Sequence, residues 1–291
     1  MPRDPLRTKL CDMLGIEYPI IAFTHCKDVA VAVINAGAFA VLGEAMHTPD
    51  EIAADIRWIR ERINGKPYGI DLVLPASSPL EGGLEDLESK IPASHRDFAA
   101  GIAKRHDVPE PKGPVALHRW GGLNQQMARA QLDVVLDERV PVFTSGLGNP
   151  AFILEAAHAR GIKVFGLIGK KRQAEREIEA GVDAIIAQGY DAAGHTGTIG
   201  TFSIVPEVAA IAGNTPVIAG GGVTTGRHLA AALCLGASGV WTGTLWLASR
   251  ESDEDMIIKE KLLAASAEDT THSRSVSGMT MRTLKCPWTE E

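Results

Sequence analysis

Eight short apolar runs recur along the chain, and stretches of helix-like sequence separate most of them. Runs of this length that are rich in β-branched residues are typical of buried strands. Strands that alternate with helices form parallel sheets with right-handed crossovers, and eight of them close an α/β barrel. The sequence therefore predicts the α/β class and a (β/α)8 TIM barrel that forms a single domain over residues 1–291. The predicted strands span residues 18–23, 38–42, 68–74, 140–143, 163–167, 182–187, 216–219 and 237–242.

Two of the intervening helices have clear end signals. The segment Thr48–Glu51 offers a capping hydroxyl, a proline at the first helical position and acidic residues in the first turn, which predicts a helix from Thr48 to Ile63. A second helix is predicted over residues 169–180, ending at Gly181.

The regular alternation is interrupted between residues 75 and 121. This stretch has no strand pattern, holds one helix candidate near residues 94–105, and is otherwise polar and rich in proline and glycine. Long connections in compact domains usually serve function. We therefore expect a lid-like insertion after strand 3, above the end of the barrel, with a solvated loop of no function as the alternative.

Composition excludes several classes of protein. The 291 residues carry a net charge of −7, which disfavours a nucleic-acid partner because such proteins concentrate Lys and Arg on one face. No apolar run reaches bilayer length and no signal peptide is evident, so neither a membrane partner nor export is predicted. Four scattered cysteines lack the spacing of a zinc site and predict reduced thiols and a cytoplasmic location; they are Cys11, Cys26, Cys234 and Cys286. No metal site is predicted from the sequence.

One histidine lies in a glycine-rich loop directly after a predicted strand. The strand at 182–187 leads into Gln188 and Gly189, and the loop continues to Gly194 and His195. Loops at the carboxyl ends of barrel strands carry active sites, and glycine allows the backbone to approach a ligand closely. His195 is therefore a candidate for proton transfer, although a glycine turn with a polar surface histidine has a similar pattern.

The next two strands also end in glycines. Gly220, Gly221 and Gly222 follow the strand at 216–219, and Gly243 and Thr244 follow the last strand. Backbone N–H groups at neighbouring strand ends and helix N-termini favour anions, and barrels often bind phosphate after strands 7 and 8. The loops are accompanied neither by the lysine of a P-loop nor by a dinucleotide-binding fingerprint. Taken alone, they fit two ligands equally well: the phosphate of a flavin, or a phosphorylated metabolite bound by a barrel without redox chemistry.

These motifs together resemble those of the nitronate monooxygenases, formerly called 2-nitropropane dioxygenases, which are FMN-dependent barrels related to a flavin-containing enoyl-ACP reductase. The resemblance extends over nearly the whole chain, through residues 14–21, 41–43, 180–195, 221–223, 243–244 and 273–278. It implies an FMN-dependent oxidoreductase in which His195 is catalytic. It also implies that the phosphate is held by Gly221, Gly222, Gly243 and Thr244, and that the flavin is lined by Gln188, Gly189 and Gly194.

The sequence also departs from the pattern of that family. Where members usually have Ala-Pro-Met after strand 1, this chain has Ala22, Phe23 and Thr24, which we expect against the flavin ring, followed by His25 and Cys26. His25 is a second candidate for proton transfer, with a hydrogen-bonded pocket residue as the alternative.

Strand 3 carries another departure, Asp71, where an asparagine that contacts the flavin is usual. A subgroup with the same segment after strand 1 resembles flavoproteins that act on CoA-linked ring-degradation intermediates. The predicted substrate is a small molecule: an alkyl nitronate oxidised with O2, or alternatively a CoA-linked or α,β-unsaturated carbonyl compound converted with a second redox substrate. A homo-oligomer is compatible with the sequence.

Overall fold

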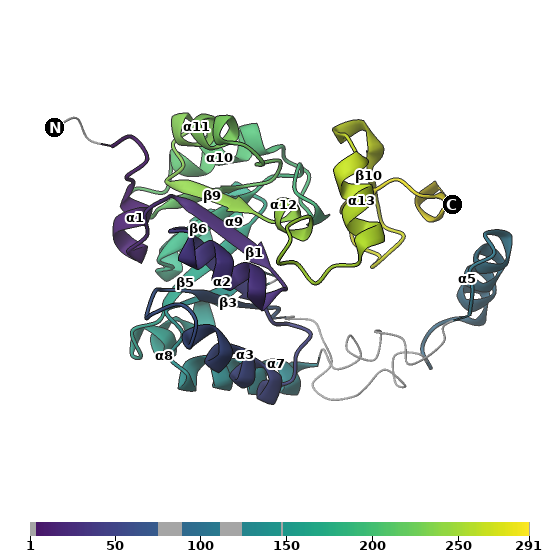
Figure 1. The fold of residues 1–291 in the computed structure, drawn as a ribbon, viewed down its shortest axis with the longest axis horizontal. Coiled ribbons are helices and arrows are strands. Elements are labelled where there is room, and N and C mark those ends of the chain that lie inside the picture. Colours follow the sequence, from purple (N-terminus) through teal and green to yellow (C-terminus); the bar gives the residue numbers. More distant parts are fainter. Residues whose placement is uncertain (1–3, 75–88, 111–123, 147, 291) are drawn as a thin grey trace.

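Eight parallel strands close into a barrel in the computed structural model, which describes residues 4–74, 89–110, 124–146 and 148–290. Figure 1 shows the helices arranged around it. Each strand overlaps one of the eight predicted runs, so the predicted (β/α)8 TIM barrel is confirmed. Pairing follows chain order and β9 returns to β1, with Ala22 opposite Thr242. The strands are β1 (Ile20–Thr24), β2 (Phe39–Gly43), β3 (Gly69–Leu72), β4 (Val142–Ser145), β5 (Lys163–Ile168), β6 (Ala184–Gln188), β8 (Val217–Gly220) and β9 (Gly239–Thr242).

A helix follows each barrel strand. The end signals predicted from the sequence for two of these helices are confirmed. Thr48 and Glu51 form a reciprocal capping box at the start of α3, and Gly181 ends α9 in the left-handed conformation. The helices are α2 (Lys27–Asn35), α3 (Pro49–Arg60), α7 (Gln125–Asp137), α8 (Leu154–His158) after the short η1 (Pro150–Ile153), α9 (Lys171–Ala180), α10 (Thr201–Ala209), α11 (Gly226–Cys234) and α12 (Thr244–Leu247).

The barrel interior is closed at its amino end. Helix α1 (Lys9–Leu14) contributes Leu10, Cys11 and Leu14 to the inner apolar cluster, which also holds Phe39 and Phe165 from the strands. A Cβ atom on Gly239 would lie 2.5 Å from the Leu10 side chain, so the helix fits tightly against the strand. A ligand of the barrel therefore has to bind at the carboxyl end of the strands.

The outer layer contains one buried acid. Glu177 of α9 is buried against Gly166 of β5, and its Oε2 atom has no hydrogen-bond partner within the described residues. Burial raises the pKa of this carboxyl to about 8. The proton is therefore held at neutral pH, which avoids an unpaired charge between sheet and helix.

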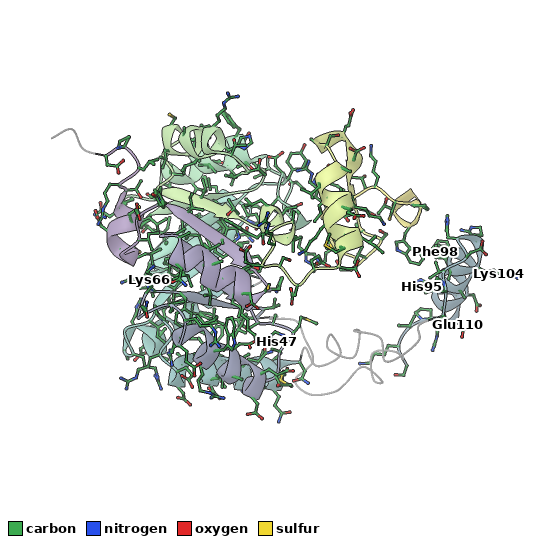
Figure 2. All side chains as sticks on the ribbon, in the orientation of Figure 1. His47, Lys66, His95, Phe98, Lys104 and Glu110 are labelled. Carbon is green, nitrogen blue, oxygen red and sulfur yellow. The ribbon has the colours of Figure 1, made fainter. Side chains whose placement is uncertain are left out.

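The described part of the predicted insertion, residues 89–110, contains helix α5 (Ala93–Arg105) and no strand, as expected. Residues 75–88 and 111–123 of this region lie outside the described residues. Figures 1 and 2 show α5 apart from the barrel and beside the C-terminal segment, with Phe98 on the side that faces this segment. Phe98 and Ile102 line a shallow depression together with Ser273, Ser275 and Trp288.

A second, three-stranded antiparallel sheet was not predicted from the sequence. Its strands are β10 (Thr270–Ser273), β11 (Met281–Leu284) and β7 (Gly194–His195), with β11 in the middle. The remaining elements of this region are α13 (Met256–Ala264), η2 (Ala267–Asp269) and α14 (Pro287–Glu290). Among the described residues, no helix combines the length and the apolar character needed to cross a bilayer.

Candidate functional site

Polar and aromatic side chains form the last interior layer at the carboxyl end of the barrel. Ile21, Val41 and Ile186 belong to the inner cluster, and side chains alternate along a strand. By this alternation the residue two positions further along each strand faces the interior as well. These residues are Phe23 on β1, Gly43 on β2 and Gln188 on β6; Asp71, which pairs with Gly43, faces the interior on β3.

Asp71 is a buried carboxyl inside this layer. Its Oδ2 atom accepts a hydrogen bond of 2.5 Å from the Thr144 hydroxyl, and the side chain is 6% exposed. Burial raises the pKa of Asp71 to about 7, and the Thr144 hydrogen bond opposes the shift. The group can therefore change protonation near neutral pH at the point where a ligand would meet the barrel.

Replacing Asp71 with asparagine is expected to stabilise the protein above neutral pH. The folded state holds the Asp71 proton up to about pH 7, whereas the unfolded chain loses it near the ordinary aspartate pKa of 3.8. Stability therefore falls as pH rises through this window, and the uncharged amide removes that loss, which amounts to a few kcal/mol. Urea unfolding of both proteins at about pH 5 and pH 8 measures the effect.

The contribution of Glu177, whose pKa is also raised, is present in both proteins and cancels in the difference between them. An Asp71→Asn variant whose stability relative to the wild type does not change between the two pH values would show that the carboxyl is already ionised in the folded state.

His195 is held by contacts on both of its sides. The ring Nε2 atom lies 2.7 Å from the Ser277 hydroxyl oxygen, and the backbone carbonyl accepts a hydrogen bond of 2.8 Å from the Gln188 amide. In the second sheet, His195 pairs with Met281 of β11. Partial burial lowers the pKa of the His195 imidazole. The ring is therefore neutral at neutral pH and can accept a proton.

The loops after β6 and β8 pack directly against each other. A Cβ atom on Gly189 would overlap the hydroxyl and the backbone nitrogen of Thr201, and one on Gly221 would lie 2.7 Å from the same hydroxyl. The Thr201 hydroxyl donates to the Gly221 carbonyl at 3.0 Å, and the Thr201 N–H donates to the Asp191 carboxylate at 2.8 Å. The two glycines are thus required by close packing as well as by any ligand.

Four backbone N–H groups at the ends of β8 and β9 have no acceptor within the described residues. They belong to Gly221, Gly222, Gly243 and Thr244, and the two strand ends are neighbours because Gly220 pairs with Trp241. A Cβ atom on Gly243 would meet nothing within 4 Å. Free donors beside open space on adjacent strand ends fit a phosphate group.

Ala22, Phe23 and Thr24 lie on β1 itself and not after it, and they are divided between two layers. Phe23 stacks on Trp241 with ring centroids 5.3 Å apart and meets the His25 ring edge-on at 5.1 Å. The His25 Nδ1 atom lies 2.9 Å from the Gly43 carbonyl oxygen, which it can reach with a donated hydrogen bond. The Ala22 side chain belongs to the outer apolar cluster, and the Thr24 hydroxyl accepts a hydrogen bond from the Cys26 N–H. These two residues therefore expose only their backbone to the barrel interior.

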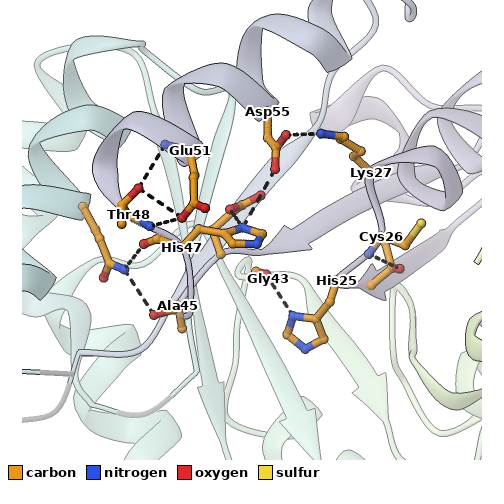
Figure 3. A network of polar contacts seen from close by, with 12 residues as sticks. His25, Cys26, Lys27, Gly43, Ala45, His47, Thr48, Glu51 and Asp55 are labelled. Carbon is orange, nitrogen blue, oxygen red and sulfur yellow. Dashed lines mark hydrogen bonds and ion pairs between the residues drawn. The ribbon is translucent and has the colours of Figure 1, made fainter. Parts of the chain in front are cut away.

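Sequence reasoning missed a polar network beside this layer, which is shown in Figure 3. Glu44 follows β2 and is fully buried; a carboxylate oxygen of Glu44 is hydrogen-bonded to His47 Nδ1, and Asp55 of α3 lies beside them. Burial raises the pKa of Glu44, and the bond to Glu44 raises the pKa of His47. A signal was present, because Glu44 is an acid at the end of a strand in an otherwise apolar run.

Comparisons of sequence agree on one family. The family model of nitronate monooxygenase matches residues 7–291. A Mycobacterium tuberculosis protein assigned as a monooxygenase is 40% identical over 98% of this chain and 78% of its own length. A Staphylococcus aureus protein assigned as a nitronate monooxygenase is 27% identical over 98% of this chain and 80% of its own length.

Solved structures with the same fold agree with this result. FabK from Thermotoga maritima is 30% identical with a TM-score of 0.76, over 98% of this chain and 76% of its own. Nitroalkane oxidase from Streptomyces ansochromogenes is 26% identical with a TM-score of 0.77, over 96% of this chain and 79% of its own.

Proposed function

Because this chain belongs to the nitronate monooxygenase family, whose members are flavin-dependent oxidoreductases, we propose that it binds FMN at the carboxyl end of the barrel and oxidises small alkyl nitronates with O2. The observation that carries the proposal is the group of free N–H donors on Gly221, Gly222, Gly243 and Thr244. They suit one terminal phosphate. A dinucleotide fingerprint, which an FAD site of Rossmann type would have, is missing from the sequence.

The interior layer would then meet the flavin ring. Asp71 and Gln188 are its polar members, and Phe23 with Trp241 gives it an apolar side. Bound FMN would supply the two-electron acceptor that the protein itself lacks. Gly189 and Gly194 would line the ring through their backbone, as would Ala22 and Thr24.

His195 is the proposed proton-transfer group. A nitronate already lacks the acidic carbon proton of its parent nitroalkane, so His195 would act beside the anion and accept or return the proton that moves when the flavin takes electrons. The lowered pKa of His195 favours the neutral imidazole, which can accept a proton. The Ser277 hydroxyl bonded to Nε2 sets the direction of the ring. His25 would orient substrate from the loop after β1, because its Nδ1 atom is already fixed by the Gly43 carbonyl.

One alternative is oxidation or reduction of a CoA-linked or α,β-unsaturated carbonyl compound with a second redox substrate. The edge-on contact between the Phe23 and His25 rings favours this alternative. These two residues form a side of the proposed pocket that differs from the Ala-Pro-Met segment usual in the family. For that reaction we expect the insertion over residues 75–121 to contribute to the binding of the larger substrate.

The test combines identification of the flavin with one anaerobic reaction. Ligand released from the purified protein by heat is expected to co-elute with FMN. Propionate 3-nitronate or ethyl nitronate is expected to bleach the oxidised flavin rapidly without O2, and to consume O2 in air without NADH. A control with the parent nitroalkane shows whether the nitronate anion itself is the reactive form.

Each other outcome has a distinct meaning. A flavoprotein whose absorbance does not respond to the nitronates would replace the nitronate proposal with the carbonyl alternative. A colourless protein that fails to bind added FMN would overturn the cofactor assignment and leave the non-redox barrel that binds a phosphorylated metabolite.

A further inference from the structure

Three metal-ligating side chains converge beside the barrel, outside the proposed flavin site. Glu44 lies just after β2, His47 lies in the following turn and Asp55 lies on α3, with their ligand atoms all within 4.8 Å of one another. His47 Nδ1 is hydrogen-bonded to Glu44 Oε2 and lies 3.9 Å from Asp55 Oδ2. Figure 3 shows the Asp55 carboxylate directed toward His47.

A second observation shows that this cluster lacks a partner. The Glu44 side chain is fully buried, yet its Oε1 atom has no hydrogen-bond donor within the described residues. Gln131 of α7, which donates to the carbonyls of Ala45 and His47 in the same turn, also has a buried oxygen without a donor. Buried acceptors without donors are costly, and a cation is the kind of ligand that satisfies them.

Lys27 occupies only part of the cluster. Its Nζ atom lies 2.5 Å from Asp55 Oδ1, and this pair is partly exposed. The other oxygen, Oδ2, is the one nearer to His47. A single carboxylate can therefore bind the ammonium with one oxygen and a metal ion with the other.

We propose that Glu44, His47 and Asp55 bind one first-row divalent transition-metal ion, for which Zn2+ is the probe. One imidazole with two carboxylates suits such an ion better than Ca2+ or Mg2+, which prefer oxygen ligands alone. Bonds of about 2.0–2.2 Å require only small movements of ligand atoms already this close. The proton shared by His47 and Glu44 leaves when the ion binds, and water completes the coordination.

The ion would fix a turn that supports the interior layer. The Glu44 N–H donates to the Asp71 carbonyl at 2.9 Å, and the adjacent Gly43 carbonyl lies 2.9 Å from His25 Nδ1. Both partners are predicted site residues. The site is therefore structural, and its existence does not depend on the proposed nitronate chemistry.

The test is a Zn2+ titration of the purified holoprotein after chelator treatment, followed by calorimetry and by thermal unfolding. We expect binding of one equivalent and a rise in melting temperature with Zn2+. Glu44→Gln and His47→Gln are each expected to weaken binding by at least about 10-fold. Lys27→Gln is expected to strengthen it, because the variant removes a positive charge that neutralises Asp55 and repels the metal ion.

The matched control is His158→Gln. His158 Nε2 lies 2.9 Å from Asp183 Oδ2, so this histidine is paired with a carboxylate as His47 is, but without a second carboxylate. Replacing His158 should therefore leave Zn2+ binding unchanged. If Glu44→Gln does not fold, the partly exposed His47 still permits the test. Absence of stoichiometric binding, or equal binding by the wild type and His47→Gln, would overturn the proposal.

Discussion

Replacing His195 with alanine is expected to slow reduction of the bound flavin by substrate by about 10²–10⁴-fold, the usual contribution of a proton-transfer group. Flavin content should be unchanged, because the alanine keeps the carbonyl that accepts from Gln188 and the backbone pairing with Met281. Stopped-flow reduction under anaerobic conditions measures the rate, and absorbance of the purified variant measures the flavin.

His272→Ala is the matched control for this variant. His272 is a neighbouring histidine on β10, where it stacks on Tyr190 and lies 2.9 Å from the Tyr190 carbonyl oxygen. Its loss should affect stability and leave the reduction rate within about 10-fold of the wild type, since it transfers no proton. Reduction of the His195→Ala protein at the wild-type rate would exclude His195 from the reaction.

Gly222→Asp is expected to weaken FMN binding by about 100-fold or more. A carboxylate about 5 Å from a phosphate charge costs roughly 3 kcal/mol at an effective dielectric constant of about 20. The glycine has a φ of +72°, and a Cβ atom would lie 3.3 Å from that of Asp191, so backbone strain adds to the repulsion. Fluorescence titration of the apoprotein with FMN measures the affinity.

Gly213→Asp is the matched control, because it places the same charge and a comparable strain away from the phosphate loops. Gly213 precedes β8, at the opposite end of the barrel, and has a φ of +56° with nothing within 4 Å of a Cβ atom. This variant carries a comparable strain and the same charge but should bind FMN normally. Full flavin occupancy of Gly222→Asp after dialysis would mean that the phosphate binds elsewhere.

The barrel could be predicted because its signals are local and repeated. Each strand is an apolar run buried on both faces, and helices such as α3 carry their own capping residues. The position of the glycine loops followed from the same argument, since parallel strands place their carboxyl ends together. Asp71 and Phe23 face the interior for the same reason, because their position on the strand sets their direction.

The second sheet had no comparable signal. Strand β7 has two residues, β10 is polar, and their partner β11 lies far along the chain from His195. Neither periodicity nor length distinguishes such segments from loops, because the pairing depends on tertiary contacts. The Glu44 network was missed for a related reason: a lone acid and a lone histidine become a cluster only when α3 packs against the end of β2.

The pairing of β7 with β11 has a consequence for the order in which the protein matures. A chain emerging from the ribosome completes the barrel once β9 is released, whereas Ser277 and Met281, which hold His195, are synthesised later. A nascent chain can therefore possess a closed barrel with its phosphate loops while the histidine is still unsupported. Competence for catalysis would be acquired last, after the fold that carries it.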